Sequence, residues 1–450
     1  MMENNSNIKK LFSPEKSFTY TLLIVLLVFG SFRPDRLMPG GRVLIHFPTL
    51  ILFVLLICYI KEPRKLVGNL QTKFFFAFMA LMIIQVPFAR NTGVSIAVIR
   101  GFVIFTIIGY LFKVQFVNNH YKIVKYIKLY VILSIFIAFL GLARGLVNLP
   151  TISDENDFAL LMNILIPFGY FLAQEATDIR KKIFYYSCVG LYVLGNVASF
   201  SRGGFVGLLG VGLYIFYRSK NKVTLIFIVV FMIVLMSAFA SQEYWDEMAT
   251  ITGQVESQSG DTGQERFDSW LGGWRMFLDH PIIGVGAQNF GMWIQDYFPI
   301  EEKAYRMWGR VAHSLYFTLL PEMGIVGTIF FFGMIWGNYK DQRYLSTLET
   351  KKGALLAATN LTEEEKESIS KGIRTLHFLS LAYGGAMVAY LVTGIFISVL
   401  WYGYFWMLTS FYVITSNVAR NIEEQIKNNS KTLKPENSIY MAYGKFDQVS

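Results

Sequence analysis

Long apolar blocks alternate with short polar segments along most of this chain. A run of about 18 or more apolar residues is long enough to cross a membrane as a helix. The pattern predicts about twelve spans, near residues 17–32, 43–60, 74–89, 96–112, 129–146, 158–174, 184–200, 203–217, 223–240, 314–337, 375–396 and 398–416. The expected fold is therefore all-α, that of a polytopic membrane protein.

Two longer polar regions divide this pattern. The expected parts are a membrane bundle of about nine spans, an extracytoplasmic loop, a second bundle of about three spans, and a cytoplasmic tail, at residues 1–240, 241–313, 314–416 and 417–450. Within the second bundle, residues 338–374 are expected to form a cytoplasmic loop with a short helix that begins after an N-cap at Thr362.

Lysine distribution predicts the orientation of the spans. With the N-terminus in the cytoplasm, every lysine-rich segment falls on the cytoplasmic side, as the positive-inside rule requires. Both termini are then cytoplasmic. Because the net charge of +10 follows the membrane topology and does not gather on one domain face, nucleic-acid binding is not expected.

The opposite side carries arginine almost exclusively, with Lys303 as its one expected lysine. Two explanations remain open. Guanidinium is a permanently charged fork that matches phosphate, and arginine also tolerates a membrane interface by snorkelling. The arginines expected on this side are Arg33, Arg36, Arg42, Arg90, Arg100, Arg144, Arg202, Arg266, Arg275, Arg306 and Arg310.

The 241–313 loop holds five of the eight tryptophans. Its segment ERFDSWLGGWRMFLDHP carries apolar residues at helical spacing and predicts an amphipathic helix that ends at Pro281. Such a helix lies along the membrane surface or caps the bundle. Aromatic side chains such as Trp270 also pack against sugar rings, but a structural role for this row is favoured.

Common catalytic motifs are absent from the sequence: it contains no Walker A loop, no HExxH and no GxSxG nucleophile elbow. The acidic segment SDENDF at 153–158 is better explained as a solvated loop than as a metal site. No metal and no cofactor is expected.

Three ionisable residues remain, each at a junction between the bundle and its outer side. Arg202 lies in a hairpin too short to leave the membrane interface, where a charge needs a partner or water, and Gly203 and Gly207 have a spacing that allows close helix packing. Arg266 opens the amphipathic helix, and His313 returns the loop to the membrane. All three are candidates for one outer cavity.

His313 begins the segment HSLYFTLLPEMGIVG. Gly324 lies eleven residues further, about three helical turns, and is expected on the face that carries the histidine. Pro321 removes a helix hydrogen bond and permits a kink. The alternative is a surface histidine that merely starts a helix.

Three segments together resemble the O-antigen ligase and polymerase superfamily. HSLYFTLLPEMGIVG has its pattern of His, a small polar residue, nine residues, Gly, two residues and Gly. RFDSWLGGWRMFLDHPIIGVGAQNFG is similar to the block before it, and SRGGFVGLLG to the upstream arginine motif. The resemblance covers roughly residues 195–335 in order.

The resemblance implies a GT-C-like membrane glycosyltransferase of bacterial surface-polysaccharide synthesis, in the cytoplasmic membrane. Its donor would be a polyprenyl-pyrophosphate-linked oligosaccharide and its acceptor a glycan or lipid, with a chain-length regulator or export machinery as candidate partners. Arg202 and Arg266 would hold the pyrophosphate and His313 would serve the acceptor hydroxyl, in an inverting, metal-independent reaction. Secondary candidates for substrate binding are Arg306, Arg310, Arg275 and Trp270.

Several activities share these motifs. A ligase and a polymerase are both compatible with them, and so is a protein O-oligosaccharyltransferase. From another class, a transporter or flippase for an anionic solute or lipid would use the same arginines. The collection of charges at one face, with no clear internal repeat, favours an enzyme over a transporter.

Overall fold

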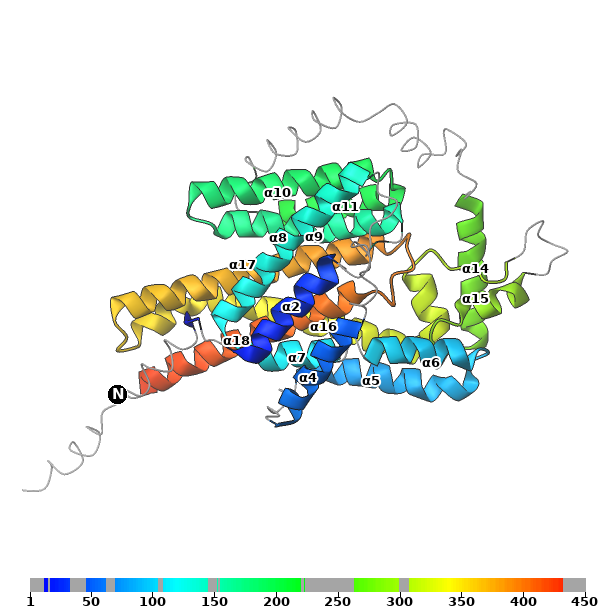
Figure 1. Ribbon diagram of the computed structural model, residues 1–450, viewed down its shortest axis with the longest axis horizontal. Coiled ribbons are helices and arrows are strands. Elements are labelled where there is room, and N and C mark those ends of the chain that lie inside the picture. Colours follow the sequence, from blue (N-terminus) through cyan, green and yellow to red (C-terminus); the bar gives the residue numbers. More distant parts are fainter. Residues whose placement is uncertain are drawn as a thin grey trace, which may run out of the picture.

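The structure is a computed structural model that describes residues 12–14, 17–32, 46–61, 69–103, 108–144, 152, 154–219, 222, 263–298 and 307–431. These residues form helices joined by turns and short loops, and no strand occurs among them (Figure 1). The all-α prediction is therefore confirmed for the described part of the chain.

The first half of the chain forms helices α2 (Phe18–Phe32), α4 (Phe47–Lys61), α5 (Leu70–Gln85), η2 (Val86–Phe88), α6 (Thr92–Gly101), α7 (Ile108–Phe116), α8 (His120–Arg144), α9 (Glu155–Glu175), α10 (Ile179–Ala198) and α11 (Arg202–Arg218). The second half forms α14 (Gly263–Asp279), α15 (Phe290–Trp293), η5 (Ile294–Tyr297), α16 (Tyr316–Ala357), α17 (Glu363–Thr393) and α18 (Gly403–Lys431).

Five of these helices are long and apolar enough to cross a membrane: α5 with η2, α8, α9, α16 and α17. Shorter apolar helices include α2, α4 and α6. The expected span at 96–112 is divided between α6 and α7, and the one at 223–240 lies outside the described residues. The membrane character is thus supported, while the number twelve stays a prediction.

The polar region 338–374 is more helical than the sequence suggested. α16 continues to Ala357, and α17 begins at Glu363 and runs on without a break into the apolar segment. Thr362 caps α17 in a capping box with Glu365, so its predicted N-cap role is confirmed. The expected short helix is instead the first part of a 31-residue helix. Its acidic first turn favours the helix start, because negative charges interact well with the positive end of the helix dipole.

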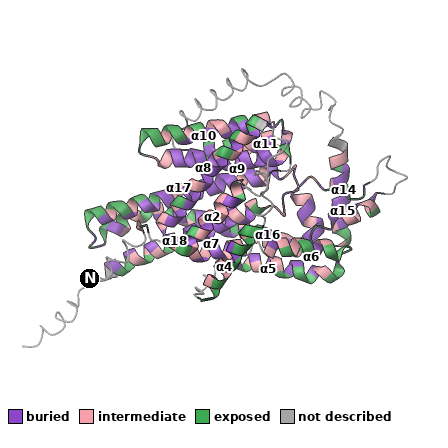
Figure 2. Cartoon of the chain, in the orientation of Figure 1, coloured by how far each residue is buried: buried purple, intermediate pink, exposed green. Residues whose placement is uncertain are grey.

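α9 is the most buried of the five membrane-length helices and lies beside α8, α10 and α11 (Figure 2). In its apolar window 94% of the residues are buried, which fits a helix that is apolar on all sides. It packs mainly against α10 and α17, and Pro167 of α9 lies close against Gly385 of α17.

The bundle has two distinct ends. α14 lies at one end and runs across the long axis, whereas the turn between α16 and α17 lies at the other (Figure 1). At that second end, Asn360 donates its N–H to Asn429 Oδ1 of α18 at 3.3 Å, and Phe12 packs against Gly372. The first and last described residues therefore lie away from α14.

Candidate active site

The helix that follows His313 is broken at Gly324, where φ is 61° and ψ is −169°. The helix itself begins at Tyr316, so the expectation that His313 and Gly324 share one helical face is wrong. The kink permitted by Pro321 occurs three residues later. Its cause is the backbone of Ile282, whose carbonyl lies so close that a Cβ at position 324 would collide with it.

Residues 281–286 fill this break. In a regular helix the carbonyls of Pro321 and Glu322 would accept from the N–H groups four residues on. Here both carbonyls accept from N–H groups of the 281–286 segment, at 2.9 and 3.1 Å. In return, the two N–H groups of α16 that lose their helical partners donate to carbonyls of that segment, at 2.8 and 3.2 Å. The buried backbone groups all stay paired, which fixes the loop to the helix.

Glu322 secures the same junction with its side chain. Its buried carboxylate accepts from the N–H groups of Gln288 and Phe290, at 2.9 and 3.1 Å, and from Trp401 Nε1 at 2.9 Å. The Gln85 amide donates to the Glu322 carbonyl at 2.8 Å. One residue thus holds together the loop after α14, the end of α5 and the segment between α17 and α18.

The loop before α16 is held in a specific conformation around His313. The backbone of His313 has a φ of 49°, a left-handed conformation that costs a non-glycine residue on the order of 1 kcal/mol. On either side, Trp270 Nε1 donates to the Ala312 carbonyl at 2.9 Å, and the Leu315 N–H donates to the Gly394 carbonyl at 2.7 Å. These anchors hold the histidine between α14 and the 394–402 segment.

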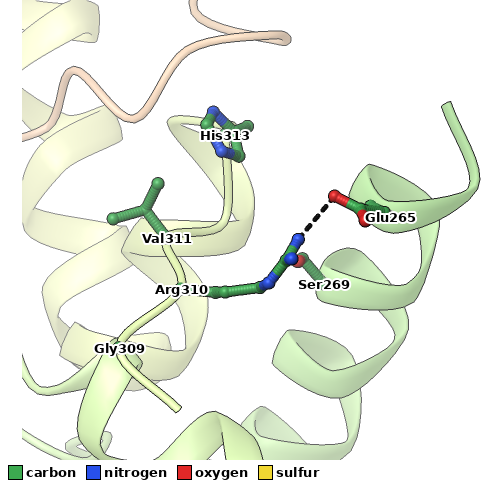
Figure 3. Close-up of a pocket in the computed structure, with 6 residues that line it drawn as sticks. All are labelled: Glu265, Ser269, Gly309, Arg310, Val311 and His313. Atoms are coloured by element: carbon green, nitrogen blue, oxygen red, sulfur yellow. Dashed lines mark hydrogen bonds and ion pairs between the residues drawn. The ribbon is translucent and has the colours of Figure 1, made fainter. Parts of the chain in front are cut away.

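A cavity of about 270 Å³ opens beside this loop (Figure 3). Its lining residues are Glu265, Ser269, Gly309, Arg310, Val311 and His313. Arg310 Nη1 forms an ion pair with Glu265 Oε2 at 2.5 Å across the gap between the loop and α14. The cavity therefore combines a guanidinium paired with a carboxylate, a hydroxyl and an imidazole, a set of donors and acceptors that suits a polar ligand.

Arg202 approaches the same region from another side. It is the first residue of α11, after a three-residue turn from α10, and Ser201 caps the helix with its hydroxyl. Gly203 packs against Phe396, and Ser314 donates its N–H to Ser398 Oγ at 3.3 Å. The 394–398 segment is therefore a shared neighbour of the α11 start and of the His313 loop.

The other expected site residues are dispersed. Arg266 lies in the first turn of α14, next to Glu265, but not among the cavity-lining residues. Arg275 donates to the Tyr297 carbonyl at 3.2 Å and lies over the Phe298 ring, and Trp270 stacks on Phe317. Both side chains thus have contacts within the protein, and their roles in substrate binding stay predictions. Arg306 lies outside the described residues.

Sequence reasoning passed over two acidic residues of this region, although each carried a signal. Glu322 is a carboxylate inside a membrane-length apolar segment, a rare and costly position. Glu265 and Ser269 are four residues apart and therefore share a face of the predicted helix. No group of three or more metal-ligating side chains occurs among the described residues.

Comparison with known proteins adds an independent observation. Residues 187–332 match the family model of the O-antigen ligases, a range that includes Arg202, Arg266, Arg310 and His313. No curated protein matches the chain. The match lies where the three sequence motifs were found, and it supports the assignment of this membrane protein to the O-antigen ligase and polymerase superfamily.

Proposed function

We propose that this protein is a membrane glycosyltransferase that transfers or polymerises a polyprenyl-pyrophosphate-linked glycan on the outer face of the bacterial cytoplasmic membrane. The observation that carries the proposal is the O-antigen ligase match over residues 187–332. The cavity beside His313 supports it, because a basic and a titratable group face one space there.

In this proposal the donor's pyrophosphate is the leaving group. The acceptor hydroxyl oxygen attacks the anomeric carbon, the bond from that carbon to the phosphate oxygen breaks, and the lipid pyrophosphate departs with the bonding electrons. A single displacement of this kind inverts the anomeric centre. Arg202 and Arg266 meet the negative charge that grows on the pyrophosphate, and hydrogen bonds to charged groups contribute about 1.5–3 kcal/mol each.

His313 is the proposed proton acceptor. A neutral imidazole can take the proton of the acceptor hydroxyl as a general base. The strained backbone of His313 supports this role, since strained residues of this kind gather at active sites. With arginines meeting the phosphate charge, the proposed reaction needs no metal ion.

The proposal can be tested by product analysis. Purified protein in lipid nanodiscs would be incubated with a polyprenyl-pyrophosphate oligosaccharide, wild type beside His313→Ala. Release of lipid pyrophosphate by the wild type alone, with a longer lipid-linked glycan, would identify a polymerase. Transfer to an added lipid acceptor would identify a ligase, and transfer to a protein hydroxyl an O-oligosaccharyltransferase.

Two further results would contradict the proposal. If reconstituted vesicles move the intact donor across the membrane and no acceptor is glycosylated, the protein is a transporter. If chelation of divalent cations stops glycan transfer, the proposed metal-independent reaction is wrong.

A further inference from the structure

The cavity beside His313 contains an internal competitor for an anionic ligand. The guanidinium of the cavity belongs to Arg310, and Glu265 Oε2 already contacts Nη1 of that group at 2.5 Å. A carboxylate presents two oxygens to guanidinium much as a phosphate does. In this arrangement the two charges largely cancel, so the cavity as it stands offers an incoming anion little net attraction.

The backbone on both sides of this pair is fixed. α14 is joined to the loop by the hydrogen bond from Trp270 to the Ala312 carbonyl, and to the start of α16 by the stacking of Trp270 on Phe317, with ring centroids 5.3 Å apart. The N–H of Gly309 donates to the Gly291 carbonyl at 2.8 Å. The side chains of Arg310 and Glu265 can therefore exchange partners while the backbone that carries them stays in place.

The pair is also weakly protected from water. The side chains of Arg310 and Glu265 are 35% and 21% exposed. An ion pair with this exposure adds little net stability because water competes for both charges. A pyrophosphate also makes bidentate contacts with guanidinium and carries more negative charge than one carboxylate, so it can take the place of the carboxylate.

We propose that Glu265 occupies a phosphate subsite on Arg310 and is displaced when a phosphate-bearing substrate binds. The inference rests on the proposed function, in which that substrate is a lipid-linked pyrophosphate. In the empty protein the carboxylate keeps Arg310 directed into the cavity (Figure 3). After transfer, Glu265 competes with the lipid pyrophosphate for Arg310 and so favours its release.

The test is a pyrophosphate titration of the full chain in nanodiscs, by calorimetry with inorganic pyrophosphate and with a short polyprenyl pyrophosphate as probes. Glu265→Gln keeps the size of the side chain and removes its charge. We expect up to about fivefold tighter binding, which corresponds to about 1 kcal/mol. Arg310→Gln should bind more weakly than wild type. Asp279→Asn, an acidic residue of α14 outside the cavity lining, is the matched control and should bind as wild type.

The double variant decides whether Glu265 acts through Arg310. If it does, Glu265→Gln should give no gain in the Arg310→Gln background. A gain that persists there would overturn the proposal, since Glu265 would then act only as a distant negative charge. Arg310→Lys provides a second background, which retains the charge but loses the fork, in case Arg310→Gln folds poorly.

Failure of this inference can be told apart from failure of the proposed function. If the wild type transfers glycan but Glu265→Gln binds both probes as the wild type does, or more weakly, the exchange is wrong and the glycosyltransferase stands. If the wild type transfers no glycan to any acceptor, the proposed function fails, and the inference that rests on it is overturned too. Tighter binding of the polyprenyl probe alone would assign the subsite to lipid-linked pyrophosphate.

Discussion

Two arginine–carboxylate pairs in this protein have the same chemistry in different surroundings. Arg420 of α18 and Asp341 of α16 lie 3.0 Å apart, and the Asp341 side chain is only 7% exposed, although the Arg420 side chain is 52% exposed. Its second oxygen accepts from Gln71 at 2.6 Å, and the Arg420 guanidinium lies over the Tyr344 ring at 4.4 Å.

The pair of Arg310 and Glu265 lies at the α14 end of the bundle and spans an open cavity instead. About 26 Å of α16 separate the break at Gly324 from Asp341. A buried carboxylate with several partners, such as Asp341, is costly to leave without its cation, because the charge remains in an apolar interior. A pair whose carboxylate is reached by water, such as that of Glu265, is cheap to exchange. The first arrangement suits structural support and the second suits ligand binding.

The largest effect should come from the cavity end. We expect His313→Ala to lower the glycan transfer rate by a factor of about 100 or more, because it removes the proposed proton acceptor. Arg266→Ala should have a similar effect through loss of charge stabilisation. Product analysis by gel or mass spectrometry measures both.

The matched control for these variants is Lys366→Ala, which breaks an ion pair with the exposed Glu363 at the other end of the bundle. It should insert into the membrane and transfer glycan as the wild type does. Normal glycan products from His313→Ala or Arg266→Ala would remove that residue from the proposed mechanism.

For the free energy of unfolding we expect the opposite order, with the larger loss at the Arg420 pair and the smaller loss at the Arg310 pair. Arg420→Ala leaves the buried Asp341 carboxylate without its cation, and we expect a loss of about 1–2 kcal/mol in the free energy of unfolding, below the cost of breaking a fully buried pair because water reaches Arg420. Arg310→Ala leaves a carboxylate that water reaches, and we expect a loss below about 1 kcal/mol. Denaturant unfolding in detergent micelles measures both values. Equal losses at the two sites would show that burial does not distinguish the pairs.

A smaller effect is expected where α11 packs on the end of α17. A Cβ at Gly207 would collide with Thr393 Oγ1 and lie 2.6 Å from Asn163 Nδ2. We expect Gly207→Ala to destabilise the protein by about 1–3 kcal/mol through overpacking. Gly212 of the same helix has no neighbour within 4 Å of its would-be Cβ, so Gly212→Ala is the matched control.

Gly212→Ala should leave stability unchanged or raise it by up to about 1 kcal/mol, because alanine favours a helix over glycine. Thermal unfolding midpoints of the two variants provide the comparison. A fall of equal size in both would mean that the close contact with α17 is not what Gly207 provides.

Local sequence patterns predicted the parts of this fold that depend on local interactions. Apolar runs marked most helices, Thr362 marked the start of α17, and the Gly203–Gly207 spacing marked a close helix contact that the structure confirms. The amphipathic pattern marked α14, which the structure places at Gly263–Asp279. In each case the signal lies within a few turns of the element it predicts.

The sequence could not predict features that join distant segments. The break at Gly324 depends on a loop some forty residues earlier in the chain, which supplies the hydrogen bonds that α16 lacks. Glu265 and Arg310 are 45 residues apart, and their pairing follows from the tertiary position of α14. The proposed roles of Arg202, Arg266 and His313 came from a resemblance and stay predictions.

The last and smallest expected effect concerns how the cavity end meets the membrane. α14 packs one face on the protein, yet a second apolar row on it stays open: Phe267, Trp274 and Leu278 are 59%, 45% and 57% exposed. Ile282, just beyond this row, is also exposed, and its carbonyl accepts a hydrogen bond from the start of the second half of α16. That part of α16 carries exposed apolar residues of its own. The exposed row of α14 is thus joined through Ile282 to a helix that is long and apolar enough to cross a membrane, and we expect this row to contact lipid.

Fluorescence quenching by lipids brominated near the headgroup tests this placement. Trp274→Phe should lower the quenched fraction of the tryptophan emission, because it removes an emitter in contact with lipid. The control Trp406→Phe should raise that fraction, because Trp406 is buried and protected from the quencher. Both shifts are small, since the chain has eight tryptophans. An unchanged or higher quenched fraction in Trp274→Phe would place the row of α14 in water, and the cavity of Arg310 would then open above the membrane and not at its surface.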